Sequence, residues 1–591
     1  MKDIKVINGK AVFPEGIKRL SDKPFDKPEE LVEVLIPPTV ERIEFHAFLG
    51  CTSLRSVVIP ASVNSLECDF STCVSLVSIT VDKDNEVYDS REDCNAIIDT
   101  ANNELISGCQ TTVIPSSVTS LGLYAFYGIC GLEHIELPAG LKKIGTSAFE
   151  RCRNLQSIVI PDGVEWIGSS AFDDCVSIKS VAIPASVQRL GDHSFGNPFI
   201  GCSSLVSVVV AEGNKIFDSR DNCNAIIETA ANKLLAGCCT TTIPESVVEI
   251  GAHAFSHLTS LESISIPTSV TKISWGAFAD CTSLVNFCIP GSIKELEPNV
   301  FSGCTKLESV TISEGVETLG YYLFQDCENL KELFIPASVR WIRFPIISGC
   351  SRLTSIKVDK DNRKFDSRED CNAIMDKFYG RADKLLAGCS TTVILPSVRT
   401  IGNSAFNGCG ITELVLPPTV TRIESAAFWN CKNLKSVTIP SSVTMIEGNP
   451  FADCESLSSI KVSEENTVYD SREDCNAIIE TNTHKLKSCS LGTSIPPTVK
   501  TIGNQAFCSG ETDIVIPEGI KRLKEGVFSD CYRLKSVTLP AGVSKIDECV
   551  FDKNDTIYVP YGKVDYYRQR IEQSCWGCIV ELPKDNATKI K

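Results

Sequence analysis

Hydrophobic positions recur along this chain at a spacing of 23 residues. The copies around Pro60, Pro138, Pro161 and Pro184 are variations on L-x-S-V-x-I-P-x-S-V-x-x-I-G-x-x-A-F-x-x-C. The alternation in L-x-S-V-x-I is typical of a β-strand with one buried face. A period in the twenties indicates a solenoid, in which each repeat buries its apolar side only against a stacked neighbour. The pattern therefore predicts a right-handed, curved, β-rich repeat solenoid with a parallel sheet on one face.

Four longer intervals interrupt this spacing, with 55 to 60 residues between successive anchor prolines. Each contains a variant of Y-D-S-R-E-D-C-N-A-I-I, beginning at Tyr88, Phe217, Phe365 and Tyr469. We expect β-hairpin-like insertions near residues 82–113, 211–242, 359–394 and 463–494, with a turn at Asn102-Asn103 in the first copy.

Both ends of the chain depart from the repeat, as terminal repeats must to cover the core. Residues 1–35 are predicted to form an N-terminal cap and an irregular first repeat, with a turn at Asn8-Gly9. Residues 36–556 form the solenoid, and no Gly/Ser-rich linker divides it. Residues 557–583 form a C-terminal cap with a short helix, predicted from the spacing of Val564, Tyr567 and Ile571 and finished by Trp576. Residues 584–591 are a polar tail.

Strand alternation separates buried from outward positions. In the repeat that ends at Pro60, Val57 and Ile59 point into the solenoid, and the side chains between them point outward. The mostly small, neutral outward positions are candidates for binding an extended partner, although small side chains also suit a crowded, curved sheet. The candidate binding residues are Ser56, Val58, Ser157, Val159, Ser180, Ala182, Ser207, Val209, Ser263, Ser309, Thr311, Phe334, Thr438, Ser536 and Thr538.

The chain has 29 cysteines, and their positions follow the repeat. Twelve of them stand three residues after a phenylalanine, as Cys73 does after Phe70. A cysteine tied to one register behaves as a small buried hydrophobe, so we expect mostly free, buried thiols. The pair Cys575-x-x-Cys578 has no second pair of metal ligands, so no metal site is predicted.

The sequence gives little evidence for a catalytic site, a cofactor site or a nucleic-acid partner. The six histidines are scattered, and the D-S-R element is copied four times, which is typical of architecture. We therefore predict a non-enzymatic protein without a cofactor. A net charge of −17 disfavours a nucleic-acid partner, and no apolar run is long enough to span a bilayer.

The repeat unit, the D-S-R-E-D-C-N-A-I-I insertions and the closing Ile557-Tyr-Val-Pro560 together resemble the BspA-like leucine-rich repeat family. The resemblance extends over nearly all of residues 12–582. It implies a leucine-rich-repeat solenoid and an adhesin-like function, in which the sheet face binds a host matrix protein, a glycan or other cells.

Two locations follow from these observations. The family implies a secreted or cell-surface protein, whereas the N-terminus has no apolar signal region and the many free cysteines suit a reducing compartment. The alternative function is therefore an intracellular scaffold for protein partners. Ligand identity and oligomeric state stay open at this point.

Overall fold

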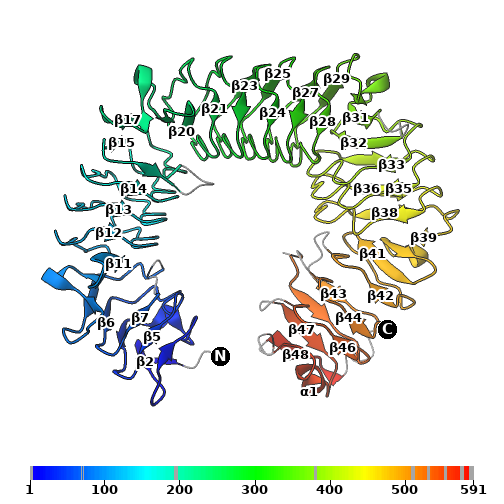
Figure 1. The fold of residues 1–591 in the computed structure, drawn as a ribbon. Helices are drawn as coiled ribbons and strands as arrows, with labels where there is room; N and C mark the ends of the chain where they lie inside the picture. The colour runs from blue at the N-terminus through cyan, green and yellow to red at the C-terminus, as the bar shows by residue number, and fades with distance from the viewer. Residues whose placement is uncertain are drawn as a thin grey trace. The chain divides into compact units, whose positions relative to one another are not determined.

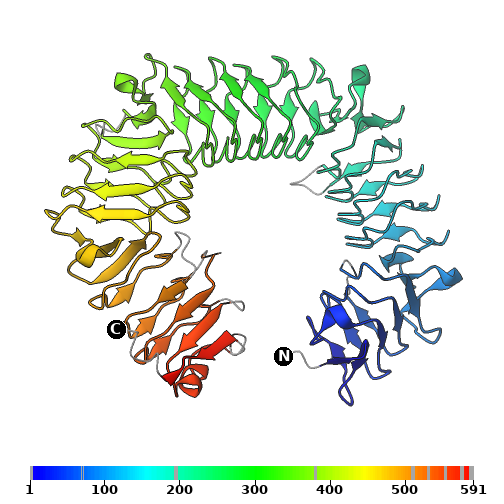
Figure 2. The ribbon, with the colours of Figure 1, turned by 180° about the vertical axis from the view of Figure 1, so that it is seen from behind.

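The computed structural model describes residues 4–67, 70, 72–191, 197–377, 383–507, 513–528, 531, 533–551, 555–572, 575 and 578–584. The chain divides into two compact units, Met1–Cys304 and Thr305–Lys591. Within each unit, short strands stack repeat upon repeat, and helix is scarce (Figures 1 and 2). The predicted β-solenoid is confirmed.

The segment L-x-S-V-x-I forms the first ladder of strands. Val57 and Ile59 are buried and Val58 is exposed, as the alternation predicted. In the first unit these strands are β1 (Lys5–Ile7), β2 (Lys10–Val12), β4 (Glu33–Leu35), β6 (Ser56–Ile59), β8 (Ser78–Val81), β15 (Ser180–Ile183), β17 (Ser207–Val210) and β23 (Asn286–Ile289). In the second unit they are β25 (Ser309–Ile312), β27 (Glu332–Ile335), β29 (Ser355–Val358), β34 (Glu413–Val415), β36 (Ser436–Ile439), β38 (Ser459–Val462), β43 (Asp513–Val515), β45 (Ser536–Thr538), β47 (Thr556–Val559) and β48 (Ile579–Glu581).

A second parallel ladder, which the sequence analysis did not predict, follows the anchor proline. Its strands are two residues long, and the second residue is usually buried, as Ile43 and Leu66 are. In the first unit they are β3 (Arg19–Leu20), β5 (Arg42–Ile43), β7 (Ser65–Leu66), β12 (Ser120–Leu121), β13 (Lys143–Ile144), β14 (Trp166–Ile167), β16 (Arg189–Leu190), β21 (Glu249–Ile250), β22 (Lys272–Ile273) and β24 (Glu295–Leu296). In the second unit they are β26 (Thr318–Leu319), β28 (Trp341–Ile342), β33 (Thr400–Ile401), β35 (Arg422–Ile423), β37 (Met445–Ile446), β42 (Thr501–Ile502), β44 (Arg522–Leu523) and β46 (Lys545–Ile546).

Each insertion is a three-stranded antiparallel element whose last strand joins the second ladder. In the first insertion β9 pairs with β10, β10 pairs with β11, and β11 lies parallel to β12. The hairpin turn falls after Asp99, where Asn103 has a φ of 51°. The insertion elements are β9 (Tyr88–Asp89), η2 (Arg91–Asp93), β10 (Ala96–Asp99), β11 (Glu104–Gly108); β18 (Phe217–Asp218), η3 (Arg220–Asn222), β19 (Ala225–Glu228), β20 (Lys233–Gly237); β30 (Phe365–Asp366), η4 (Arg368–Asp370), β31 (Ala373–Asp376), β32 (Lys384–Gly388); β39 (Tyr469–Asp470), η5 (Arg472–Asp474), β40 (Ala477–Glu480) and β41 (Lys485–Cys489).

One asparagine side chain fixes the start of each insertion to the preceding repeat. Asn85 donates from Nδ2 to the carbonyls of Pro60 and Val63, both at 2.9 Å. Its Oδ1 accepts from the amides of Val87 and Tyr88. The same four hydrogen bonds form at Asn214, Asn362 and Asn466. This asparagine is therefore a docking pin common to all four insertions.

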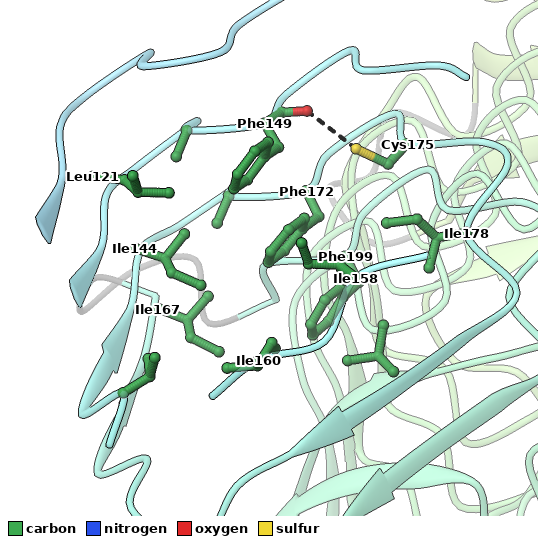
Figure 3. Close-up of a cluster of buried hydrophobic side chains, with 14 of the residues drawn as sticks. Leu121, Ile144, Phe149, Ile158, Ile160, Ile167, Phe172, Cys175, Ile178 and Phe199 are labelled. Carbon is green, nitrogen blue, oxygen red and sulfur yellow. Dashed lines mark hydrogen bonds between the residues drawn. The ribbon is translucent and has the colours of Figure 1, made fainter. Parts of the chain in front are cut away.

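The core is a set of stacked side-chain ladders (Figure 3). Phe149, Phe172 and Phe199 are buried, and successive ring centroids lie 5.3 and 5.4 Å apart. The thiol of Cys175 donates to the carbonyl of Phe149 in the preceding repeat at 3.1 Å. Cys152 makes the same bond to the carbonyl of Phe126. Cysteine recurs here because it is small, apolar and able to donate to a buried carbonyl.

The two ends of the chain continue the ladders. At the N-terminus, β1 and β2 form the expected hairpin, with positive φ at Asn8 and Gly9, and η1 (Pro28–Glu30) follows. At the C-terminus, helix α1 (Val564–Arg568) is shorter than predicted. Tyr567 is fully buried, and Ile571 is buried beyond the helix end. Trp576 and residues 585–591 lie outside the described residues.

Candidate binding surface

Most of the candidate binding residues are accessible to solvent. The exposed ones are Val58, Ser157, Val159, Ser180, Ala182, Val209, Ser263, Thr311, Phe334 and Thr438. The half-buried ones are Ser56, Ser207, Ser309 and Thr538. Ser536 differs, because it is only 8% exposed and its hydroxyl donates to the Asp513 carboxylate on the neighbouring strand. Among the candidate residues, Ser536 is therefore the one that is barely accessible to solvent.

The face that carries these residues is a series of short sheets. The first ladder breaks up into β1-β2-β4-β6-β8 and β15-β17 in the first unit, and into β25-β27-β29, β34-β36-β38 and β43-β45-β47-β48 in the second. Ser180 lies beside Ser207, and Ala182 beside Val209, on paired strands. Ser157, Val159 and Ser263 lie outside the named strands, so the expectation of a strand at these positions is wrong.

The five-stranded sheet of the first unit carries an apolar run that the sequence analysis missed. Val12, Leu35 and Val58 are 52%, 69% and 42% exposed. They lie on the consecutive strands β2, β4 and β6, with Leu35 directly beside Val58. Neighbouring strands are about 5 Å apart, so the three side chains are contiguous. Leu35 occupies the same outward position as Val58, and this register is the signal that could have revealed it.

Charged residues border this apolar run. Lys10 and Glu33 lie on adjacent strands, with Nζ and Oε2 3.1 Å apart, and both side chains are largely exposed. Exposed ion pairs contribute little to stability, typically below about 1 kcal/mol. The sheet therefore presents an apolar row beside a row of mixed charge.

The repeated D-S-R element holds the insertion together. Arg91 donates from Nε to both carboxylate oxygens of Asp89, at 2.9 and 3.0 Å, and from Nη1 to Asn103 at 2.8 Å. The fourth copy has the same Asp470–Arg472 pair. Burial alone would raise the pKa of Asp470, but hydrogen bonds from Arg472 and Thr481 more than offset this and lower it. The element ties one turn to another, which agrees with an architectural role.

The described cysteines are free thiols. Burial raises the pKa of Cys152 to about 12, so this thiol is essentially never a thiolate at neutral pH. Cys130, Cys288 and Cys549 are exposed, and Cys68 and Cys508 lie outside the described residues.

Within the described part of the chain, no group of three or more His, Cys, Asp or Glu side chains is arranged to hold a metal ion. Helices both long enough and apolar enough to cross a bilayer are likewise absent from the described residues.

A family model described as "BspA type Leucine rich repeat region (6 copies)" matches residues 9–91, 104–224, 231–367, 383–488 and 475–558. The chain belongs to the BspA-type leucine-rich repeat family. The resemblance drawn from the repeat unit is confirmed. Leucine-rich repeats of this kind are an interaction fold and are generally non-enzymatic.

Solved structures that this BspA-type chain is similar to come from several bacteria. A leucine-rich cell surface protein from Faecalibacterium prausnitzii is 22% identical, with 72% of this chain and 90% of that chain covered and a TM-score of 0.34. A leucine-rich repeat protein from Eubacterium ventriosum is 18% identical, with 73% and 85% covered and a TM-score of 0.35. One from Bacteroides ovatus is 23% identical, with 80% and 89% covered and a TM-score of 0.27. No curated protein matched.

Proposed function

We propose that this BspA-type protein is a non-enzymatic, adhesin-like binding protein whose sheet face engages an extracellular protein, a glycan or another cell. The observation that carries the proposal is the apolar run of Val12, Leu35 and Val58 on β2, β4 and β6. Burying such a side chain completely contributes about 1.5–3 kcal/mol relative to leaving it exposed. A partner that covers the run would recover this free energy.

The surrounding surface supports the same proposal. The polar row beside the run, including Lys10, Glu33 and Ser56, supplies the hydrogen-bonding rim that interfaces usually have around an apolar centre. The small side chains of Ser180, Ala182 and Ser207 extend a shallow face on β15 and β17. A long shallow face suits a macromolecular ligand better than a small molecule.

The test is binding of the full chain to immobilised matrix proteins, such as fibronectin, laminin and collagen, and to intact host cells. Replacing Leu35 and Val58 together with lysine should reduce binding at least about tenfold, because two apolar anchors become charged. The matched control replaces Val113 and Val393 with lysine, because both are exposed apolar residues outside the first ladder.

A second variant tests the rest of the face. Changing Ser157, Val159, Ser180 and Ala182 together to lysine or glutamate should also reduce binding if the ligand extends along the first unit. If both variants bind as wild type does and circular dichroism shows an intact fold, the sheet-face proposal is refuted. Equal loss in the control would assign the effect to added charge.

The exposed thiols Cys130 and Cys288 favour a second candidate, an intracellular scaffold. Exposed free thiols oxidise outside the cell, whereas a reducing compartment preserves them. Protease shaving of intact cells with peptide mapping separates the two candidates. Release of repeat peptides while a cytosolic marker stays intact supports the adhesin-like protein, and protection until lysis supports the scaffold.

A further inference from the structure

The second unit contains a cleft of about 610 Å³ beside its first insertion. One wall is the return segment from Ala337 to Arg340, which leads into β28. The other wall is the segment 361–364, which leads into β30, and it contributes Asp361, Arg363 and Lys364. The lining thus contains three cationic side chains and one carboxylate, with Arg340 on one wall and the others on the opposite wall. This volume lies in the range of sites that bind small molecules or short oligomers.

The docking pin fixes the two walls relative to each other. Asn362 is 1% exposed and donates to the carbonyls of Pro336 and Val339, both at 2.9 Å. It also accepts from the amides of Lys364 and Phe365. The walls are therefore held by buried hydrogen bonds, and a ligand would enter a site that is already formed.

The residue that follows β28 differs in charge from its counterparts in the second ladder. Elsewhere, the residue after the two-residue strand is often a carboxylate that pairs with a basic side chain, as Glu297 does with Lys272 and Asp547 with Arg522. Arg343 occupies this position after β28. Within the described residues, no carboxylate forms an ion pair with Arg340, Arg343 or Arg363. On a chain with a net charge of −17, this is a local cationic site.

Aromatic side chains accompany these cations. Trp341 lies next to the cleft residue Arg340 and is 58% exposed, and Lys364 Nζ lies 5.5 Å from its ring centroid. The guanidinium of Arg343 lies 5.9 Å from the ring of Tyr321, which is also exposed. Trp341 and Tyr321 therefore place exposed aromatic rings beside these cations.

The fourth insertion is an internal comparison on the same scaffold. Its pin, Asn466, makes the same four hydrogen bonds. At the positions of Arg340, Trp341, Arg363 and Lys364 it has Thr444, Met445, Thr467 and Val468. The backbone arrangement thus does not require the cationic and aromatic residues.

The backbone of the cleft offers little to an extended peptide. A single carboxylate, that of Glu314, accepts from the amides of Ala337 and Ser338, at 2.8 and 3.1 Å. The Ser338 hydroxyl donates to the carbonyl of Val316. Strand addition by a peptide requires free backbone groups, so recognition here must come from side chains.

We propose that this cleft binds an acidic saccharide, a short sugar chain carrying carboxylate or sulfate groups. The guanidinium groups of Arg340 and Arg363 would hold the acidic groups by paired, charge-assisted hydrogen bonds. The indole of Trp341 would pack against the apolar face of a sugar ring, as aromatic side chains do with an amphipathic ligand. This site is separate from the sheet face and does not depend on the function proposed for it.

The experiment is isothermal titration calorimetry of the full chain with defined probes in about 0.15 M salt, where weak surface electrostatics are screened. The probes are a heparin-derived hexasaccharide, hexagalacturonate, maltohexaose, hexaglutamate and sodium sulfate. The test variant exchanges the site for its fourth-insertion counterpart, with Arg340→Thr, Trp341→Met, Arg363→Thr and Lys364→Val. This variant keeps residues that the same scaffold already accommodates.

We expect at least one of the two acidic hexasaccharides to bind and the exchange to weaken its binding at least about tenfold, since charge-assisted contacts are lost. The matched control replaces the exposed Lys179, Lys306 and Lys500 with threonine and should leave binding within about twofold, because it removes the same charge elsewhere. Trp341→Met alone should weaken saccharide binding and leave sulfate binding unchanged.

Several results would overturn the proposal. The site is not a saccharide site if neither acidic hexasaccharide binds, or if maltohexaose binds as tightly as they do. Equal affinity for hexaglutamate would instead assign it to acidic peptides, and sulfate binding as tight as the saccharides would reduce it to an anion site. Equal loss in the lysine control would show diffuse electrostatics in place of a defined cleft.

Discussion

The four docking pins allow the effect of burial to be separated from the number of hydrogen bonds. Each pin makes the same four bonds, but Asn362 is 1% exposed whereas Asn214 is only half-buried. The perturbation is the same substitution, asparagine to alanine, at each of these two positions. At both, it removes the side-chain partner of two carbonyls and two amides, although the proline carbonyl still accepts from the amide three residues later.

The expected magnitudes differ because water can replace the lost partner only where it can reach. A buried group left unsatisfied costs about 1–3 kcal/mol, whereas a hydrogen bond that water can replace contributes about 0.5–1.5 kcal/mol. The structure can relax around the small alanine side chain, which reduces the total destabilisation expected from the groups that lose their partner. We therefore expect Asn362→Ala to cost about 3–5 kcal/mol and Asn214→Ala about 1–2 kcal/mol.

A long repeat protein need not unfold in one step, so the assay must be local. Hydrogen exchange measured by mass spectrometry reports the opening free energy of the peptides that contain residues 361–366 and 213–218. The loss of protection at the pin peptides should be larger by about 2 kcal/mol, or roughly 30-fold in exchange rate, for Asn362→Ala. Binding of the acidic hexasaccharide should weaken in the same variant, because one wall of the cleft is released.

Asn362→Asp is a further control. It keeps an acceptor for the two amides but places a carboxylate against the carbonyls of Pro336 and Val339, so it should cost at least as much as alanine. If alanine lowered the opening free energy equally at Asn362 and Asn214, the reasoning would be refuted, because the number of hydrogen bonds and not their burial would then set the loss of stability. A negligible loss of opening free energy in Asn362→Ala would refute it more directly.

Three other predictions concern the core and its ionisable groups. Phe172→Ala should cost about 3–5 kcal/mol and raise hydrogen exchange first in the adjacent repeats, because solenoid repeats contact only their neighbours; uniform destabilisation of both units would contradict this. Burial raises the pKa of Asp173 to about 6, above its ordinary value of 3.8, so the charged form destabilises the fold and wild-type stability falls as pH rises through 6. Asp173→Asn should therefore be more stable than wild type at pH 8, by at most about 3 kcal/mol, and equal to it below pH 4, as hydrogen exchange of the peptides around residue 173 in variant and wild type at each pH will show. Iodoacetamide should label Cys130 and Cys288 in the native protein and leave Cys152 unmodified until denaturation, and rapid native labelling of Cys152 would contradict its burial.

The sequence determined the solenoid because the signals for it are local and repeated many times. The alternation around Val57 and Val58 separates the core from the outer face, and the register of Cys175 marks it as a core residue. These properties depend on backbone periodicity and on burial, and both are encoded within a single repeat. The hairpin at Asn8-Gly9 is equally local, since its turn requires positive φ.

Hydrogen bonding between repeats was decided only by the tertiary structure. The two-residue strands of the second ladder are too short to show alternation, and their partners lie a whole repeat away. The segment around Ser157 fits the strand pattern but forms no named strand, and the repeat before it, at residues 133–137, forms none either. A ladder requires a correctly spaced backbone on the neighbouring strand, and one repeat cannot specify that spacing.

Side-chain functions that depend on a neighbouring repeat were also hidden in the sequence. Asn362 lies among polar residues and reads as an ordinary turn residue, yet its amide is buried against the preceding repeat. Arg340 and Arg363 are 23 residues apart in sequence, and they line one cleft whose two walls are joined by the hydrogen bonds of Asn362. Sequence thus determined which side chains enter the core, whereas packing between repeats determined which polar side chains meet, because each such contact joins atoms of two different repeats.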